Sequence, residues 1–273
     1  TDLISPEKAI SMLGTMLGGY SVEALVEILK IGKFGSAAAE ALKNTILVYD
    51  AFNEIFDLSK NNEHAKDIIH SCAEAEWFNN KPSLAKEIQL TVYKVSGETN
   101  TDDFSPAKEA WSRPDIPLHA QAFLKFSENM ESPLEKLEEL KQDGSKLVFV
   151  GDVVGTGSSR KSAANSMLWH MGDDIPCVPA KRTGGFCFGN KIAPIFYNTL
   201  QDSGALPIEL DVDNLDHGKK IILKPYDGQV LDAETLEVIS TFEFKSDVIF
   251  DEVQAGGRIN LIIGRQLTDK TRE

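Results

Sequence analysis

Two serines and an arginine follow a glycine-rich turn near the middle of the chain, and their types and spacing favour anion binding. Residues 148–165 read VFVGDVVGTGSSRKSAAN, which predicts an apolar strand, a tight turn and then Ser158, Ser159 and Arg160 at the start of a helix. A helix N-terminus presents unpaired N–H groups and the positive end of the helix dipole. Two hydroxyls and a guanidinium at that position are suited to a carboxylate or a phosphate.

Two interpretations of this segment involve no catalysis. The first is a dinucleotide-binding turn, since Gly155 and Gly157 follow a strand and precede a helix. The third glycine of that fingerprint falls on Arg160, whose side chain would prevent close packing of the helix on the strand. The second is a helix cap, in which Ser158 or Ser159 bonds free N–H groups and Arg160 pairs with a surface acid.

The third interpretation is a carboxylate site with a catalytic serine. A serine hydroxyl is a poor base unless its alkoxide is stabilised, and a helix N-terminus beside an arginine would do so. Ser159 and Arg160 would then hold a substrate carboxylate, the arginine through two parallel hydrogen bonds. No Ser-His-Asp set accompanies Ser158, so the sequence does not support nucleophilic catalysis.

Another candidate, Arg113, stands in a stiff loop at residues 111–117. Pro114 and Pro117 restrict the backbone there, and Pro117 is expected to begin a helix that continues to Phe126. Both a surface salt bridge and a role in ligand binding are open for Arg113.

Residues 5–86 read as helices throughout. Ser5 and Pro6 form a helix start signal, and Gly32 is expected to end the second helix. Short helices joined by glycine-containing turns predict an all-helical, HEAT-like array, whose simplest role is a structural or partner-binding platform. Four helices are expected, at residues 6–17, 22–31, 37–56 and 64–78.

The hydrophobic period changes from that of helices to that of strands at Ile88. Residues 90–95 alternate like a half-buried strand, and residues 174–179 are expected to form another short strand. From residue 220 onward, short strands with tight turns predict a small antiparallel sheet or barrel-like layer. The sequence therefore predicts a helical domain at residues 1–86 and a mixed α/β domain at residues 87–273, strand-heavy towards its end.

Composition limits the classes of function. The 273 residues carry a formal net charge of −14, which argues against wrapping nucleic acid over the whole surface. No run of 18 apolar residues is present and residues 1–6 do not resemble a signal peptide, so no membrane span is expected. Cys72, Cys177 and Cys187 form no CxxC pair and are expected to be buried, reduced thiols in the cytoplasm. Both ends look like cuts inside a longer protein.

Several motifs resemble the swivelling domain of the aconitase superfamily. They are Gly157–Arg160, residues 192–198 and residues 204–208. Residues 101–105, Thr-Asp-Asp-Phe-Ser, are also similar to the family's Thr-Asp-His-Ile-Ser segment. In this chain Asp103 stands in place of the histidine. Lys-Ser-Ala at residues 161–163 replaces the usual Glu-His-Ala, and a helical domain comes first, as in the aconitase B branch. The resemblance covers essentially the whole chain. It implies an α + α/β fold, with a HEAT-like array followed by a swivelling β/β/α domain.

The resemblance also implies an activity and site residues. The activity is that of a hydro-lyase that interconverts citrate and isocitrate through cis-aconitate, and 2-methylisocitrate is a further substrate accepted in this branch. Ser158 matches the base that removes the carbon-bound proton of the substrate and also contacts the substrate. Ser159, Arg160 and Arg113 match residues that bind substrate oxygens and carboxylates. Asp102 matches an aspartate that orients catalytic groups.

The cofactor implied is a [4Fe–4S] cluster held by cysteines of domains outside this chain. Cys72, Cys177 and Cys187 match none of those ligands by spacing, so no metal site is expected here. The partners implied are citrate, isocitrate and cis-aconitate, and the iron–sulfur domains of the same full-length protein. In the family, the enzyme that has lost its cluster binds messenger RNA, and the helical domain mediates protein contacts and homodimerisation. RNA binding is therefore the alternative function, for which the basic residues are Lys161, Lys181, Arg182 and Lys191.

Overall fold

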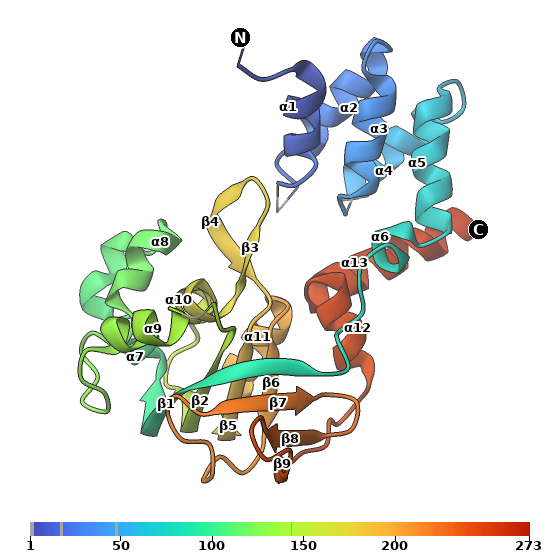
Figure 1. Ribbon diagram of the computed structural model, residues 1–273. Helices are drawn as coiled ribbons and strands as arrows, with labels where there is room; N and C mark the ends of the chain where they lie inside the picture. The colour runs from blue at the N-terminus through green and yellow to red at the C-terminus, as the bar shows by residue number, and fades with distance from the viewer. Residues whose placement is uncertain (1–2, 17–18, 47–48, 143) are drawn as a thin grey trace. The chain divides into compact units, whose positions relative to one another are not determined.

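The computed structural model describes residues 3–16, 19–46, 49–142 and 144–273, and their contacts group the chain into two compact units (Figure 1). Unit 1 contains residues 1–82, 175–179 and 259–273; unit 2 contains residues 83–174 and 180–258. Within the described residues, no helix combines the length and apolar character needed to cross a membrane. The predicted division at residues 86 and 87 stays a prediction.

Unit 1 consists mainly of short helices. The first helix begins at the expected signal, where the Ser5 hydroxyl accepts a hydrogen bond from the Lys8 N–H at 3.2 Å, but it ends at Leu13, earlier than predicted. The second helix is as predicted, and Gly32 ends it with a φ of 81°. Leu17, predicted on the first helix, lies outside the described residues. The helices are α1 (Pro6–Leu13), α2 (Val22–Ile31), α3 (Gly35–Lys43), α4 (Tyr49–Leu58), α5 (Glu63–Ala73), α6 (Glu76–Asn79) and α13 (Arg258–Arg272).

Two of the expected helices are each divided in the structure, so these predictions were wrong. The helix predicted at 37–56 is α3 followed by α4. The Asn44 side chain donates to the Glu40 carbonyl and the Thr45 hydroxyl donates to the Leu42 carbonyl, so side chains satisfy the last turn of α3 and end it. The helix predicted at 64–78 is α5 followed by α6, divided at Ala75, which has a left-handed φ of 55°.

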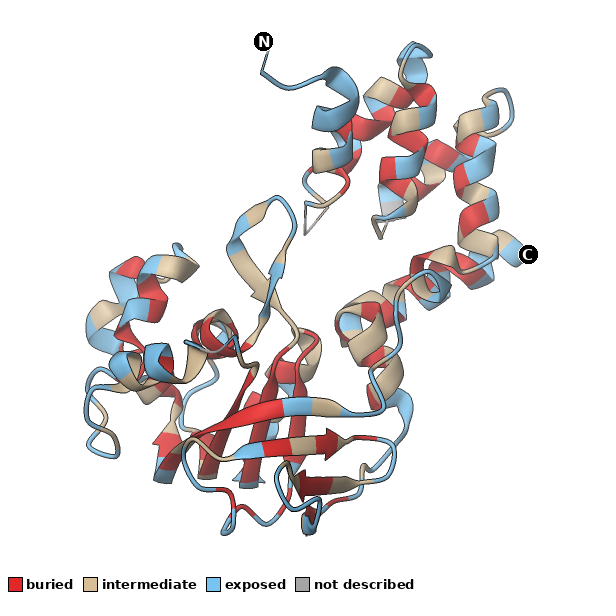
Figure 2. Ribbon diagram, in the orientation of Figure 1, coloured by how far each residue is buried: buried red, intermediate tan, exposed pale blue. Residues whose placement is uncertain are grey.

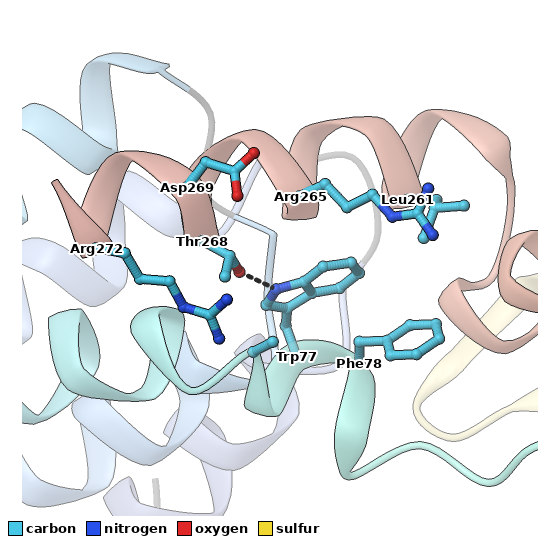
Figure 3. Close-up of a pocket in the computed structure, with 8 residues that line it drawn as sticks. Trp77, Phe78, Leu261, Arg265, Thr268, Asp269 and Arg272 are labelled. Atoms are coloured by element: carbon cyan, nitrogen blue, oxygen red, sulfur yellow. Dashed lines mark hydrogen bonds between the residues drawn. The ribbon is translucent and has the colours of Figure 1, made fainter.

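The chain ends in helices, which corrects the prediction of a strand-heavy end. Residues 259–263 are almost all apolar and resemble a strand locally. The residues of α13 that are buried are nevertheless Leu261, Gly264, Leu267 and Thr268, which is helical spacing. Thr268 accepts a hydrogen bond from Trp77 Nε1 at 2.9 Å (Figure 3). Its hydroxyl also donates to the Cys72 carbonyl at 2.9 Å. This helix therefore completes the core of unit 1.

Unit 2 contains a seven-stranded mixed sheet in the order β6-β5-β2-β1-β7-β8-β9. The first four are parallel and the last three antiparallel. The hairpins predicted after residue 220 are thus present, but they extend the main sheet instead of forming a separate layer. The strands of the sheet are β1 (Ile88–Asn100), β2 (Leu147–Thr156), β5 (Phe186–Ile192), β6 (Leu206–Glu209), β7 (Lys220–Lys224), β8 (Gln229–Asp232) and β9 (Val238–Thr241).

The single strand predicted at 174–179 is a separate two-stranded sheet, formed by β3 (Asp173–Ile175) and β4 (Val178–Thr183). Cys177 connects the two strands with a φ of 64° and is exposed, contrary to the expectation that it would be buried. Its place in a turn keeps it out of the core. Cys187, on β5, is fully buried as expected, and Cys72 is intermediate.

Both faces of the central strands are buried (Figure 2). Val92 and Val148 belong to one apolar cluster with Ile249 of α12, whereas Tyr93 and Phe149 belong to another cluster on the opposite face with Met167 of α10. Apolar residues at successive positions of β1 and β2 are typical of strands covered on both sides. The helices of unit 2 are α7 (Thr101–Phe104), α8 (Ile116–His119), α9 (Pro133–Lys141), α10 (Lys161–Met171), α11 (Pro194–Asp202) and α12 (Val248–Ala255).

The helix predicted from Pro117 to Phe126 is shorter than expected. The Asp115 carboxylate accepts a hydrogen bond from the Leu118 N–H at 3.0 Å, so α8 begins one residue earlier. A short 3₁₀ turn, Ala120–Ala122, follows it, and Leu124 has a φ of 56°, which is incompatible with a continuing helix. A second 3₁₀ segment, η1 (Ala107–Ser112), precedes Arg113.

Gly264→Ala tests the fit of α13 against Trp77. A Cβ at residue 264 would lie 2.5 Å from atoms of the buried Trp77 ring. Helix propensity alone would make alanine more stable by about 1 kcal/mol, whereas overpacking costs about 1–3 kcal/mol. We therefore expect a net decrease in the free energy of unfolding, measured by urea denaturation. Gln266→Ala, at an exposed position of the same helix, is the control and should have little effect. A stabilised Gly264→Ala protein would contradict the packing of Trp77 on α13.

Candidate functional site

The carboxyl ends of two adjacent parallel strands bring the predicted site segments together. Asn100, the last residue of β1, is paired with Thr156, the last residue of β2. Helix α7 follows β1 directly, and Gly157–Arg160 connect β2 to α10. Ligands of parallel sheets with helices on both faces bind at the carboxyl ends of the strands. The pairing therefore places Asp102 and the Ser-Ser-Arg segment at the same edge of the sheet.

Two glycines are needed for the turn after β2. Gly155 has a φ of 78°, and a Cβ there would lie 2.3 Å from atoms of Phe196. Gly157 has a φ of 89° and lies beside Thr101, whose hydroxyl donates to the Ser158 carbonyl at 2.8 Å. A side chain at either glycine would be strained in this conformation. The Thr101–Ser158 hydrogen bond connects the two site segments directly.

Helix α7 is held by a reciprocal cap. The Asn100 side chain accepts hydrogen bonds from the Asp102 and Asp103 N–H groups, and the Asp103 carboxylate accepts one from the Asn100 N–H at 2.8 Å. Burial raises the pKa of the Asp103 carboxyl. Asp103 therefore has a structural role here. The neighbouring Asp102 is exposed and faces the other segment.

Arg160 connects the segment after β2 with the segment after β1, through an ion pair and a hydrogen bond. Its Nη1 forms an ion pair with Asp102 Oδ1 and donates to the Ser105 carbonyl at 3.3 Å. The hydrogen bond from Arg160 holds the pKa of the Asp102 carboxyl below its usual value. The Asp102 carboxylate also accepts the Ala107 N–H at 3.1 Å. Asp102 therefore orients the guanidinium of Arg160.

Arg113 reaches the same carbonyl. Its Nη2 donates to the Ser105 carbonyl oxygen at 3.5 Å, and its Nε is buried without a hydrogen-bond partner among the described residues. Two guanidiniums thus contact one neutral acceptor, while Asp102 is the one carboxylate that pairs with either of them among the residues that the structure describes. Arginine pairs with carboxylates and phosphates through two parallel hydrogen bonds. An anionic ligand would supply the acceptors that this pair of arginines lacks.

Ser158 and Ser159 precede the helix instead of forming its first turn. Helix α10 begins at Lys161, and Arg160 occupies the N-cap position without a capping side-chain bond. Both serines are exposed, and among the described residues neither hydroxyl has a hydrogen-bond partner. The structure thus brings Asp102, Arg113 and Arg160 together around Ser105, and it attaches Ser158 to them through Thr101.

Sequence reasoning missed a buried histidine behind the arginines. His119 Nε2 lies 2.7 Å from the Ser105 hydroxyl, and His119 Nδ1 lies 2.8 Å from the Ser112 hydroxyl. The Ser105 hydroxyl is also 2.7 Å from that of Ser162 on α10. Residues 105, 112 and 119 are spaced seven apart, but they lie in or next to three different short elements, and Ser162 lies on α10. The spacing therefore does not reflect one helix face, and the sequence carried no interpretable signal for this cluster.

The cysteines of the chain do not fit an iron–sulfur cluster. Among the described residues, no group of three or more His, Cys, Asp or Glu side chains is arranged to hold a metal ion. Cys187 is fully buried in the core, where burial raises the pKa of its thiol, and burial raises the pKa of Cys72 to about 11. Cys177 is exposed in a turn. A cluster is held by thiolates, so these residues offer no ligand set for it.

His170, on α10, makes the stability of the protein dependent on pH. Its Nε2 donates to the Ala120 carbonyl at 2.9 Å, and burial lowers its pKa to about 4. The unfolded chain binds a proton near pH 6.5, whereas the folded chain does so only near pH 4. Stability is therefore fully present above pH 6.5 and decreases as the pH falls towards 4. The lowered pKa of His170 corresponds to a loss of about 3 kcal/mol in the free energy of unfolding over this pH range.

His170→Gln removes this titration and keeps an amide that can donate to the Ala120 carbonyl. We expect its free energy of unfolding to fall less between pH 6.5 and 4 than that of the unaltered protein, as measured by urea denaturation at each pH. His70→Gln, at an exposed position on α5, should preserve the full decrease. An unchanged decrease in His170→Gln would show that another group causes it.

Comparison with known sequences covers nearly the whole chain. A family model described as "Aconitate hydratase 2 N-terminus" matches residues 90–273, and one described as "Aconitate B N-terminal domain" matches residues 1–78. The aconitate hydratase B proteins of Escherichia coli and Salmonella typhimurium are each 57% identical over 280 residues, and that of Helicobacter pylori is 50% identical over 272 residues. These alignments cover 99% of this chain and 32% of each relative. The chain thus spans about a third of the length of these relatives.

Comparison with solved structures finds a protein of similar fold. The crystal structure of 3-isopropylmalate dehydratase from Methanocaldococcus jannaschii matches with a TM-score of 0.51 and 18% sequence identity. The match covers 68% of this chain and 99% of the other. A structural match at this identity shows the fold alone, whereas the family model that matches residues 90–273 covers well over half of the chain. The chain therefore belongs to the aconitase B family.

Proposed function

We propose that this chain supplies part of the active site of an aconitate hydratase, a hydro-lyase that interconverts citrate and isocitrate through cis-aconitate. The observation that carries the proposal is the meeting of Arg113 and Arg160 at the Ser105 carbonyl, at the same edge of the sheet as the exposed Ser158 and Ser159. A substrate with several carboxylates complements two guanidiniums whose donors are not all used. Membership of the aconitase B family selects the tricarboxylate among possible anions.

In this proposal Ser158 is the catalytic base. A serine alkoxide is unfavourable in water, and a positive charge with the N-terminal end of α10 would stabilise it. Ser158 lies two residues before Arg160 and three before the start of α10, so both effects are close in the chain. The alkoxide would remove the carbon-bound proton of the substrate, and the resulting hydroxyl would return a proton in the reverse reaction.

The remaining site residues would bind and orient the substrate. Ser159, Arg160 and Arg113 would hold its oxygens and carboxylates, together with Ser158. Asp102 would act through Arg160, because their ion pair fixes the direction of the guanidinium. When bound, a [4Fe–4S] cluster in the full-length enzyme would supply a Lewis acid, held by domains outside this chain. The described residues offer no ligands for it, so no step assigned to this chain depends on it.

Ser158→Ala and Arg160→Lys in the full-length enzyme test these roles. Removal of the base should lower kcat by at least about a hundredfold, since general base catalysis contributes about 10²–10⁴-fold. Lysine cannot donate two parallel hydrogen bonds, so Arg160→Lys should also abolish turnover. Both positions are exposed or half-buried, so thermal unfolding should change little. Ser246→Ala, at another exposed serine of unit 2, is the control. Near-normal turnover in either site variant would refute the assigned role.

The isolated 273-residue chain is expected to show no aconitase activity, because it would provide only part of the active site. The measurement is conversion of citrate to cis-aconitate, followed by ultraviolet absorbance. Turnover by the purified chain in the absence of an iron–sulfur cluster would overturn the proposal that other domains complete the site.

The proposal extends to the organisation of the protein. Residues 1–86 would form a HEAT-like array that mediates protein contacts and homodimerisation, and residues 87–273 would form a swivelling β/β/α domain. The full-length enzyme would be cytoplasmic and would also accept 2-methylisocitrate. The packed helices of unit 1 support a platform role, because their buried residues form a core of their own.

Messenger RNA binding by the enzyme without its cluster ranks second. Arg182 pairs with Asp174 and stacks on Trp169 at 4.6 Å, so it offers less charge to RNA than the sequence suggests. We expect no salt-dependent shift of RNA by this chain at micromolar concentration in a gel-shift assay. A shift that weakens steeply with salt would favour RNA binding, because phosphate contacts release counterions.

A further inference from the structure

Ser105 is the residue through which the two arginines of the site meet. Its carbonyl oxygen accepts hydrogen bonds from Arg113 Nη2 and Arg160 Nη1 at 3.5 and 3.3 Å. Its hydroxyl points into a different set of contacts, with His119 and Ser162. The residue is fully buried, so its backbone can move little once its side chain is fixed. Whatever fixes the Ser105 side chain therefore also fixes the acceptor shared by the arginines.

The hydrogen bonds around His119 have a single consistent direction. The Ser112 hydroxyl donates to the Glu109 carbonyl at 2.8 Å, so its oxygen must accept from His119 Nδ1–H. A neutral imidazole that is protonated at Nδ1 accepts at Nε2, and the Ser105 hydroxyl therefore donates to it. The Ser162 hydroxyl is then the donor to the Ser105 oxygen. We call this chain of hydrogen bonds, Ser162–Ser105–His119–Ser112, the relay. Each of its hydroxyl and imidazole protons is thus assigned to one donor.

The surroundings keep the imidazole neutral. His119 is 2% exposed, and burial together with the charge of Arg113 lowers its pKa. A buried cation at this position would face Arg113 across a low-dielectric region, which is unfavourable. A neutral histidine with both nitrogens bonded is rigid, because rotation would break two buried hydrogen bonds.

We propose that His119 is a positioning residue, which holds Ser105 so that its carbonyl aligns Arg113 and Arg160 for a substrate carboxylate. This inference rests on the proposed function of the same site. It assigns to the segment after Arg113 a role that does not require contact with substrate. It also explains why a polar relay is buried behind an exposed site, since satisfied polar networks define one arrangement of their members.

The first test is the tautomer of His119 in this chain, from long-range ¹H–¹⁵N correlation spectra. We expect Nδ1 protonated and Nε2 unprotonated, which is the less common tautomer of histidine. In Ser112→Ala the Nδ1 acceptor is lost, and the proton should move to Nε2. An imidazolium, or protonation at Nε2 in the unaltered chain, would overturn the relay.

The second test is kinetic and uses the full-length enzyme with its cluster. Ser112→Ala and His119→Leu should raise the KM for citrate about tenfold, equivalent to about 1.4 kcal/mol, with kcat changed less than about threefold, because they weaken substrate binding uniformly. His119→Gln should restore KM towards normal, since its amide oxygen can accept from the Ser105 hydroxyl. Ser166→Ala is the matched control. Like Ser112, Ser166 is a buried serine, but it lies on α10 and its hydroxyl has no hydrogen-bond partner among the described residues.

The variants separate positioning from general stability. If His119→Leu fails to fold, the comparison of Ser112→Ala with His119→Gln and Ser166→Ala decides. A lower melting temperature with an unchanged KM in Ser112→Ala would reduce the relay to a structural role and overturn the proposal. Near-normal turnover in Ser158→Ala would instead refute the role of Ser158 as the catalytic base. In that case a raised KM in Ser112→Ala would still show that the relay affects carboxylate binding. The two proposals thus fail separately.

Discussion

The parallel pairing of β1 with β2 is the constraint on which the site depends. It aligns Asn100 with Thr156, and each strand then continues directly into a site segment. Because side chains alternate along a strand, a slip of one residue would exchange the two buried faces. Burial of Val92 and Val148 on one face, and of Tyr93 and Phe149 on the other, opposes such a slip. The apolar core therefore determines where Asp102 and Ser158 lie, although neither residue belongs to it.

Local hydrogen bonds then convert this alignment into a defined geometry. The Asn100–Asp103 cap fixes α7, and the Thr101 hydroxyl fixes the turn at Ser158. The Thr101 bond uses the backbone carbonyl of Ser158 and leaves the Ser158 hydroxyl free of it. Hydrogen bonds of this kind each contribute only about 1–3 kcal/mol to stability, so several together are needed to hold an exposed loop. The exposed serines can then remain without partners while their backbone is held in place.

The sequence predicted the parts of this structure that depend on local patterns. The strand–turn–helix at 148–165 and the helix start at Ser5 follow from apolar runs, glycines and capping residues. The missed features depend on contacts between distant residues. Residues 259–263 read as a strand until their packing in unit 1 is known, and the bonds of His119 to Ser105 and Ser112 depend on the fold of a loop. The order of the sheet, with three antiparallel strands added beyond β1, also has no local signal.

The charge of the site differs in sign from that of the chain. The chain carries a net charge of −14, yet Arg113 and Arg160 outnumber Asp102 where they meet, and His119 behind them is kept neutral by burial. If the imidazole were cationic, its positive charge would be buried and costly; if Ser105 were replaced by a carboxylate, it would neutralise the arginines. Asp102 pairs with Arg160, whereas the Ser105 carbonyl that both guanidiniums share and the relay behind it are neutral. That arrangement leaves Arg113 without a carboxylate partner among the described residues, so its positive charge is available to an incoming anion. An acid in place of Ser105, Ser112 or His119 would remove that charge excess.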